Sequence, residues 1–169
     1  MPQPPPGIVR TEPGPGQESA WDYPRPPAVQ PSGKHVVVTL GGVVIIDTRS
    51  ALRVLETSHP PSWYLPMTDV LAHAVQPAPG NSYCEWKGVA QYVDLVAGGI
   101  RAERAAWYYP EPVLGFTALR DHLALYPALM DSCTVDGEVV VPQEGGFYGG
   151  WITGDVVGPF KGPPGTHGW

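Results

Sequence analysis

Short runs of β-branched and aromatic residues recur through the middle of the chain, and glycine or proline separates most of them. Their spacing of roughly 8–12 residues, without a long helical period, is typical of a mainly β domain with antiparallel strands. Paired glycines or Asp-Gly between runs predict tight hairpin turns at Gly41-Gly42, Gly98-Gly99 and Asp136-Gly137. The predicted strands are residues 35–40, 43–48, 51–56, 63–65, 82–86, 89–96, 105–109, 123–126, 132–135 and 138–141.

Alternation within residues 51–56 divides the side chains of this predicted strand between the two faces of a sheet. Leu52 and Val54 share one face, and Arg53 and Leu55 share the other. A cation among apolar strand residues is expected either to pair with a carboxylate or to serve a ligand.

The segments between the strands predict loops and short helical turns. Thr68 is expected to cap a helical turn that contains Asp69, and residues 117–123 fit one further helical turn. Residues 77–81, Pro-Ala-Pro-Gly-Asn, are expected to form a loop. Gly88 lies between the predicted strands 82–86 and 89–96, where we expect it to cause a break or a β-bulge.

Proline and glycine crowd both ends of the chain and divide it into an N-terminal arm (1–33), a β domain (34–141) and a C-terminal arm (142–169). Proline fixes φ and removes a hydrogen-bond donor, so the first arm is expected to be extended and largely disordered. Its residues 21–27 hold two aromatics, which indicate either docking onto the domain or a loose linker. Aromatics in the second arm indicate that it wraps over the sheet or over a partner chain.

The composition narrows the classes of partner and compartment. A formal net charge of −6 leaves no basic surface for sequence-independent nucleic-acid binding, so we expect no nucleic-acid partner. Two cysteines in 169 residues do not make a secreted disulfide framework, and the N-terminus shows no signal-peptide pattern. No apolar run approaches the ~18 residues of a membrane span. We therefore expect a cytoplasmic protein that does not bind membranes.

Five motifs follow one another between residues 35 and 141. They are Gly42-Val43-Val44-Ile45-Ile46-Asp47-Thr48, Ala51-Leu52-Arg53-Val54-Leu55-Glu56-Thr57, Tyr64-Leu65-Pro66 with Asp69-Val70, Cys84-Glu85-Trp86-Lys87-Gly88, and Ala106-Trp107-Tyr108-Tyr109-Pro110 with Pro112. Together they resemble domain-of-unknown-function family 427, and the two arms look like those of actinobacterial members. The resemblance implies a β-tent fold, in which two antiparallel sheets lean together and leave a cleft at the open edge.

The family is sometimes labelled nucleotidyltransferase-like, which implies phosphate chemistry. The chain has no glycine-rich phosphate loop followed by Lys-Ser/Thr and no Asp-x-Asp pair for Mg²⁺. Several other β-tent families bind zinc through two Cys-x-x-Cys pairs, which this chain lacks, so we expect no metal site. The sequence leaves any cofactor undefined.

Residues 82–92 bring a cysteine, a lysine, a carboxylate and three aromatics into one stretch. A nearby Lys87 would lower the pKa of the Cys84 thiol and activate it as a nucleophile. The alternative interpretation is a small apolar core cysteine. Strict alternation puts Cys84 and Lys87 on opposite faces, so they converge only if Gly88 or a bulge bends the strand.

Lys87 and Arg53 are the candidate anion-binding residues, since arginine offers a bidentate fork and lysine a point charge. The alternative is that they form internal salt bridges with Glu56 and Asp69. These two carboxylates are in turn candidates for general acid or base catalysis if they are desolvated.

Tyr64, Trp107 and Tyr109 are aromatic strand residues that would shape a pocket, although most aromatics of a small β domain belong to its core. The five histidines show no metal-ligand spacing. His59 lies in a loop beside the aromatic strand, so it could reach the cleft, but we favour its interpretation as a solvated loop histidine.

Two hypotheses of different classes follow. In the first, a cleft in the sheet binds a small anionic molecule, with or without catalysis by Cys84, Lys87, Glu56 or Asp69. In the second, the protein is a non-catalytic interaction or homo-oligomerisation module, such as a homodimer, that uses its aromatic, Pro/Gly-rich arms.

Overall fold

The computed structural model describes residues 3–169, and residues 1–2 of the predicted N-terminal arm lie outside the described residues. Over this range the chain has no α-helix; its helical elements are short 3-10 turns between strands. The mainly β, antiparallel fold class is confirmed. No helical element of residues 3–169 has the length and apolar character needed to cross a membrane.

The elements alternate along the chain between strands and these turns. They are β1 (Glu18–Ser19), η1 (Ala20–Asp22), β2 (Ala28–Ser32), β3 (Val36–Leu40), β4 (Val43–Thr48), β5 (Ala51–Leu55), β6 (Ser62–Pro66), η2 (Met67–Asp69), η3 (Ala72–Ala74), β7 (Val75–Cys84), β8 (Gly88–Ala97), β9 (Ile100–Tyr108), η4 (Thr117–Leu119), β10 (His122–Leu125), η5 (Pro127–Leu129), β11 (Ser132–Val135), β12 (Glu138–Val139), β13 (Val141–Pro142), β14 (Trp151–Ile152) and β15 (Val156–Val157).

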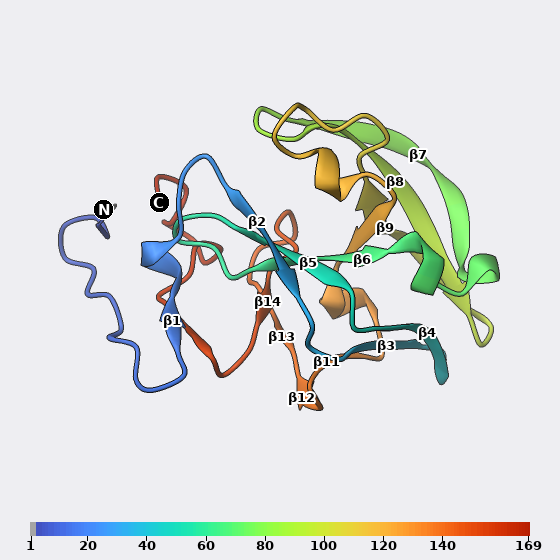
Figure 1. Ribbon diagram of the computed structural model, residues 1–169, viewed down its shortest axis with the longest axis horizontal. Helices are drawn as coiled ribbons and strands as arrows, with labels where there is room; N and C mark the ends of the chain where they lie inside the picture. The colour runs from blue at the N-terminus through green and yellow to red at the C-terminus, as the bar shows by residue number, and fades with distance from the viewer. Residues whose placement is uncertain (1–2) are drawn as a thin grey trace.

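Two antiparallel sheets form the body of the molecule (Figure 1). The larger has seven strands in the order β2-β5-β6-β10-β9-β8-β7, and the smaller has four in the order β12-β11-β3-β4. Two small sheets, the parallel pair β1-β15 and the antiparallel pair β13-β14, hold the ends of the chain.

The main core lies between the two larger sheets. Strand alternation directs Val38 of β3 and Trp63 and Leu65 of β6 into this one buried cluster. Tyr64, between the last two, points the other way into a second cluster that also holds Tyr109. The seven-stranded sheet therefore has buried side chains on both faces, and the second face is where the cavity described below forms.

The hairpin turns β3–β4 and β8–β9 meet backbone against backbone. Gly41 and Gly98 both adopt left-handed φ angles, +58° and +56°. A Cβ atom on Gly98 would lie 1.9 Å from the carbonyl oxygen of Gly41, so a side chain there has no space. This contact joins a turn of the small sheet to a turn of the large one.

The predicted loop at residues 77–81 is wrong, because β7 runs through it from Val75 to Cys84. The pairing with β8 shifts register between Pro77 and Asn81. Since β7 is an edge strand, its prolines need not donate to a neighbour on the outer side.

Residues 82–92 form part of a β-hairpin, in which β7 and β8 pair with each other across a turn. The sequence predicted two strands separated by a break or bulge at Gly88. The predicted strand 82–86 ends at Cys84, which pairs with Gly88, and residues 85–87 form the turn between them. Gly88, with φ +112°, opens β8. This turn is the bend that the convergence of Cys84 and Lys87 requires.

Two smaller predictions also differ from the structure. Thr68 does not cap a helical turn, because η2 begins after Pro66 and has no side-chain cap. Residues 138–141 do not form one strand: β12 stops at Val139, and Val141 pairs instead with Ile152 of β14.

Both arms pack against the sheets, and the first and last strands lie side by side (Figure 1). Strand β2, within the predicted first arm, forms an edge of the seven-stranded sheet. Trp21 is 2% exposed and donates its Nε1–H to the Pro159 carbonyl at 2.9 Å, so residues 21–27 dock and are not a loose linker. Trp151 is fully buried, which confirms that the second arm wraps over the chain's own sheet.

Candidate functional site

A cavity of about 280 Å³ lies against the face of the seven-stranded sheet that carries Tyr64 and Tyr109. We call it the central cleft. Strands of the sheet form its floor, the β7–β8 turn forms one wall, and residues of the C-terminal arm form another. Its lining includes Val54, Glu56, His59, Tyr64, Cys84, Trp86, Lys87, Trp107, Tyr109, Gln143, Tyr148 and Lys161. The cleft is thus on the outer face of this sheet, and not between the two sheets.

Lys87 enters the central cleft from the β7–β8 turn. The main-chain oxygen of Lys87 accepts from the Val113 N–H at 2.9 Å, which ties the turn to the loop after β9. The Nζ atom lies 5.9 Å from the centroid of the Tyr109 ring. Within residues 3–169, Lys87 forms no ion pair with a carboxylate.

Both burial and acidic neighbours influence the pKa of Lys87. Burial lowers the pKa of this ammonium, but the hydroxyl of Tyr64, the thiol of Cys84 and the carboxylate of Glu56 together raise it by more. The net shift is upward, so Lys87 is a cation at neutral pH.

The floor of the cleft is a rigid group of aromatic side chains. Tyr64 is 1% exposed, and its hydroxyl oxygen accepts from Trp107 Nε1 at 3.3 Å. The ring of Tyr109 lies 6.3 Å from that of Tyr64, and burial raises the pKa of Tyr109 well above its usual value. These rings offer flat apolar surfaces with their polar ends directed at one another.

Gln143 of the C-terminal arm fixes the tautomer of His59. The Gln143 Oε1 accepts from the Gly150 N–H at 3.1 Å, and Nε2 donates to the Lys161 carbonyl at 2.7 Å. The same Nε2 lies 3.3 Å from His59 Nδ1, so Nδ1 is an acceptor and the ring proton is on Nε2. The Nε2 atom of His59 lies 3.5 Å from Glu56 Oε2. A neutral imidazole therefore faces the carboxylate.

Burial, followed by the positive charge of Lys161, lowers the pKa of His59 to about 3. Arg25 and Lys87 act in the same direction. His59 is therefore neutral at physiological pH, and the expectation of a solvated histidine is wrong.

Acid is expected to destabilise the protein through His59. Folded His59 titrates near 3 and unfolded histidine near 6.5, so the unfolded state binds more protons between these pH values. Stability therefore falls as the pH drops below about 6.5. Between pH 7 and pH 5 this loss is about 2 kcal/mol, and His59→Asn should remove it from the unfolding free energy measured in urea.

His73→Asn is the control, because His73 is exposed. The control variant should keep the acid sensitivity of the wild type. Equal pH dependence in wild type and His59→Asn would contradict the buried neutral imidazole.

Cys84 ends β7 at the rim of the central cleft and is partly buried against the second core cluster. It shares the cavity with Lys87 because the turn at residues 85–87 folds both toward it. Both interpretations of this cysteine thus keep a structural basis, since its thiol packs on apolar groups and also lines the site.

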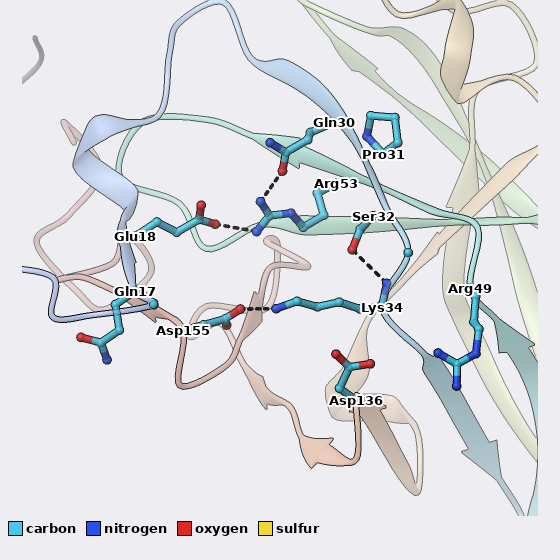
Figure 2. Close-up of a pocket in the computed structure, with 12 residues that line it drawn as sticks. Gln17, Glu18, Gln30, Pro31, Ser32, Lys34, Arg49, Arg53, Asp136 and Asp155 are labelled. Atoms are coloured by element: carbon cyan, nitrogen blue, oxygen red, sulfur yellow. Dashed lines mark hydrogen bonds and ion pairs between the residues drawn. The ribbon is translucent and has the colours of Figure 1, made fainter.

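Arg53 does not join Lys87. Figure 2 shows its guanidinium between Glu18 and Gln30, in a separate polar pocket near the N-terminal arm. Arg53 Nη1 lies 2.5 Å from Glu18 Oε1, and Nη2 donates to Gln30. Arg53 therefore does not line the central cleft as expected. It forms an internal salt bridge, the alternative prediction, but with Glu18 instead of Glu56 or Asp69.

Asp69 also lies outside the cleft. Its Oδ2 accepts from the Thr48 hydroxyl at 2.6 Å, which fixes η2 against the end of β4. Of the predicted catalytic residues, the structure brings together Cys84, Lys87 and Glu56; of the predicted ligand-binding residues, it adds Tyr64, Trp107 and Tyr109.

Five residues of the C-terminal arm line the cleft and were not among the candidates: Gln143, Phe147, Tyr148, Gly149 and Lys161. Tyr148 packs edge-on against His59 at 5.1 Å, and Lys161 Nζ lies 5.6 Å from the Tyr148 ring centroid. The one sequence signal for them was the aromatic content of the arm.

The chemistry of the cleft combines cations, aromatic side chains and two carboxylates: Glu56, which Arg25 holds at 3.7 Å, and the exposed Glu85 of the β7–β8 turn. Among residues 3–169, no three His, Cys, Asp or Glu side chains are grouped as a metal site would require. The arrangement suits an organic anion with an apolar body.

Fold and cleft together define a mainly β protein with an aromatic, lysine-containing cavity on the outer face of its larger sheet. The chain belongs to the family described as a domain of unknown function (DUF427), whose model matches residues 28–136. The match begins at the first residue of β2, which agrees with the place of that strand in the sheet. A comparison with curated proteins found no match.

Proposed function

We propose that the protein binds a small organic anion in the central cleft, with Lys87 as the anion-binding residue. The observation that supports this is a half-buried lysine, without an ion-pair carboxylate among residues 3–169, at the wall of an aromatic cavity. Its ammonium group is charged at neutral pH and can attract an anion from solution, and the partly apolar surroundings strengthen that attraction.

The other residues of the cleft support the same ligand class. The Glu56 carboxylate pairs with Arg25 at 3.7 Å and faces the neutral His59 ring, and it forms no ion pair with Lys87. Tyr64 and Trp107 are held by each other and present ring faces to the cavity. An anionic group at Lys87 would place the body of the ligand on these rings.

A chemical step is compatible with this proposal. Cys84 is the nucleophile and Glu56 the proton acceptor that the cavity would offer to a bound molecule. Binding through Lys87 is the first requirement, and it can be tested without knowing the reaction.

The test is a thermal-shift screen of the full chain against butyrate, benzoate, inorganic phosphate, AMP and glucose 6-phosphate. A compound at one hundred times its dissociation constant stabilises the native state by about 2.7 kcal/mol, which corresponds to about 5–10 °C in a chain of this size. Lys87→Met should abolish that shift, and its ligand-free melting transition checks that the variant is folded.

Lys34→Met is the matched control, since Lys34 pairs with Asp155 outside the cleft. It should retain the ligand-induced shift. A shift that persists in Lys87→Met, or no shift with any anion, would rule out the proposed site.

The alternative function, an interaction or homo-oligomerisation module, depends on aromatic residues of the arms. Trp21 and Trp151 are buried in their own chain, which removes them from a surface for partners. Phe147, which is 71% exposed, is the arm residue that still favours this alternative. The mass of the wild type and of Phe147→Ser in solution would test it.

A further inference from the structure

A second cavity of about 510 Å³ adjoins the central cleft. We call it the outer groove. It lies between the C-terminal arm and the region of β8, β9 and η5, and its lining includes Arg104, Pro127, Leu129, Pro142, Gly145 and Gly146.

The two cavities share walls. Ser82, Tyr92, Tyr126, Gln143, Phe147 and Tyr148 line both of them. The Tyr126 hydroxyl donates to the Phe147 carbonyl at 3.3 Å, so this part of the arm is held at the boundary. The two cavities therefore lie side by side, with Lys87 in the central cleft and Leu129 in the outer groove.

Two polar side chains of the outer groove are already hydrogen-bonded. The Ser82 hydroxyl accepts from the Tyr92 hydroxyl at 3.1 Å, and the Gln143 amide is engaged at both of its ends. The exposed Arg104 guanidinium lies over the Tyr92 ring at 4.4 Å and, within residues 3–169, keeps its N–H donors free. A ligand rich in hydroxyls or base edges would therefore find few new hydrogen bonds in the groove away from Arg104.

The apolar groups of the outer groove are, in contrast, open to solvent. Leu129 is 47% exposed and Phe147 is 71% exposed, and prolines and glycines supply much of the remaining surface. Covering such side chains with hydrocarbon is favourable.

We infer that the ligand is an elongated amphipathic carboxylate, with its head at Lys87 and an aliphatic chain that runs along the outer groove. The inference rests on the proposed function, because it takes the head group to be bound at Lys87. The elongated shape follows from the six lining residues that the two cavities share, and the apolar end follows from the exposed Leu129 and Phe147.

The experiment compares butyrate with decanoate by isothermal titration of the full chain. Each buried CH₂ strengthens binding about fourfold, so decanoate should bind at least tenfold more tightly than butyrate. Lys87→Met should abolish binding of both. Arg104→Met should leave binding of both compounds dependent on Lys87, because the head lies in the central cleft.

Two variants address the outer groove alone. Leu129→Asn removes an exposed apolar wall, and Gly146→Leu fills the groove from a glycine whose Cβ would meet no atom within 4 Å. Both should remove most of the preference for decanoate and leave butyrate binding intact. Leu114→Asn, a change of similar kind at a 91% exposed site outside both cavities, should keep the preference.

The failure of this inference is distinct from failure of the proposed function. Equal affinities for butyrate and decanoate, both dependent on Lys87, would overturn the chain-binding groove and leave the anion site in place. Decanoate binding that depends on Arg104 and not on Lys87 would overturn the orientation. Absence of any Lys87-dependent binding would overturn both proposals.

Discussion

Gly98→Ala is expected to lower the free energy of unfolding by at least ~3 kcal/mol. The residue has φ +56°, which alone disfavours any Cβ. The added methyl would also lie 1.9 Å from the Gly41 carbonyl oxygen and 2.7 Å from its carbonyl carbon, both of them backbone atoms. A backbone contact cannot be relieved by a side-chain rotation, so one of the two hairpins must move.

Gly99→Ala separates the two causes. Gly99 is next in the same turn and has φ +80°, but its Cβ would meet no atom within 4 Å. It should cost only the left-handed backbone strain, about 1 kcal/mol. Urea denaturation of the two variants measures the difference, and equal losses would show that the contact between the turns is unimportant.

Trp151→Ala is expected to cost about 3–5 kcal/mol, the range for a fully buried tryptophan. Trp151 stacks on Trp63 with ring centroids 5.9 Å apart, and its Nε1 donates to the Leu125 carbonyl at 3.4 Å. Its backbone N–H donates to the Pro61 carbonyl at 2.8 Å. The side chain therefore anchors the C-terminal arm in the main core.

Phe147→Ala is the control on the same arm, since this aromatic is 71% exposed and should change stability by less than about 0.5 kcal/mol. The anchoring also predicts a local effect in Trp151→Ala. Amide hydrogens of Gly150 and Gln143 should lose protection from exchange, because their bonds hold the arm at the cleft. Unchanged protection there would mean that the arm docks without Trp151.

The elements that the sequence predicted well are those that depend on local geometry. Gly41-Gly42 and Gly98-Gly99 mark hairpins because both positions of each turn need positive φ, and the structure has it at all four. The loop at residues 77–81 was wrong because proline and glycine also occur in an edge strand, and edge position is a property of the whole sheet.

The candidate site likewise has parts that local sequence patterns predict and parts that depend on the complete fold. Alternation along β5 already placed Val54 on the face opposite to Arg53, and the cleft lies on the Val54 side. Lys87 and Cys84 were found because a single turn brings them together. His59 and Tyr148 meet only after the C-terminal arm has crossed the sheet, which no local pattern indicates.

Because the C-terminal arm completes the cleft, the parts of the cleft are translated at different times. The floor and the β7–β8 turn belong to the family-matched region, residues 28–136, which leaves the ribosome first. Gln143, Tyr148 and Lys161 follow later, and they supply the wall that encloses the cavity. A nascent chain can thus form most of both main sheets before the cleft has this wall, and the cavity is enclosed only once the C-terminal arm has docked.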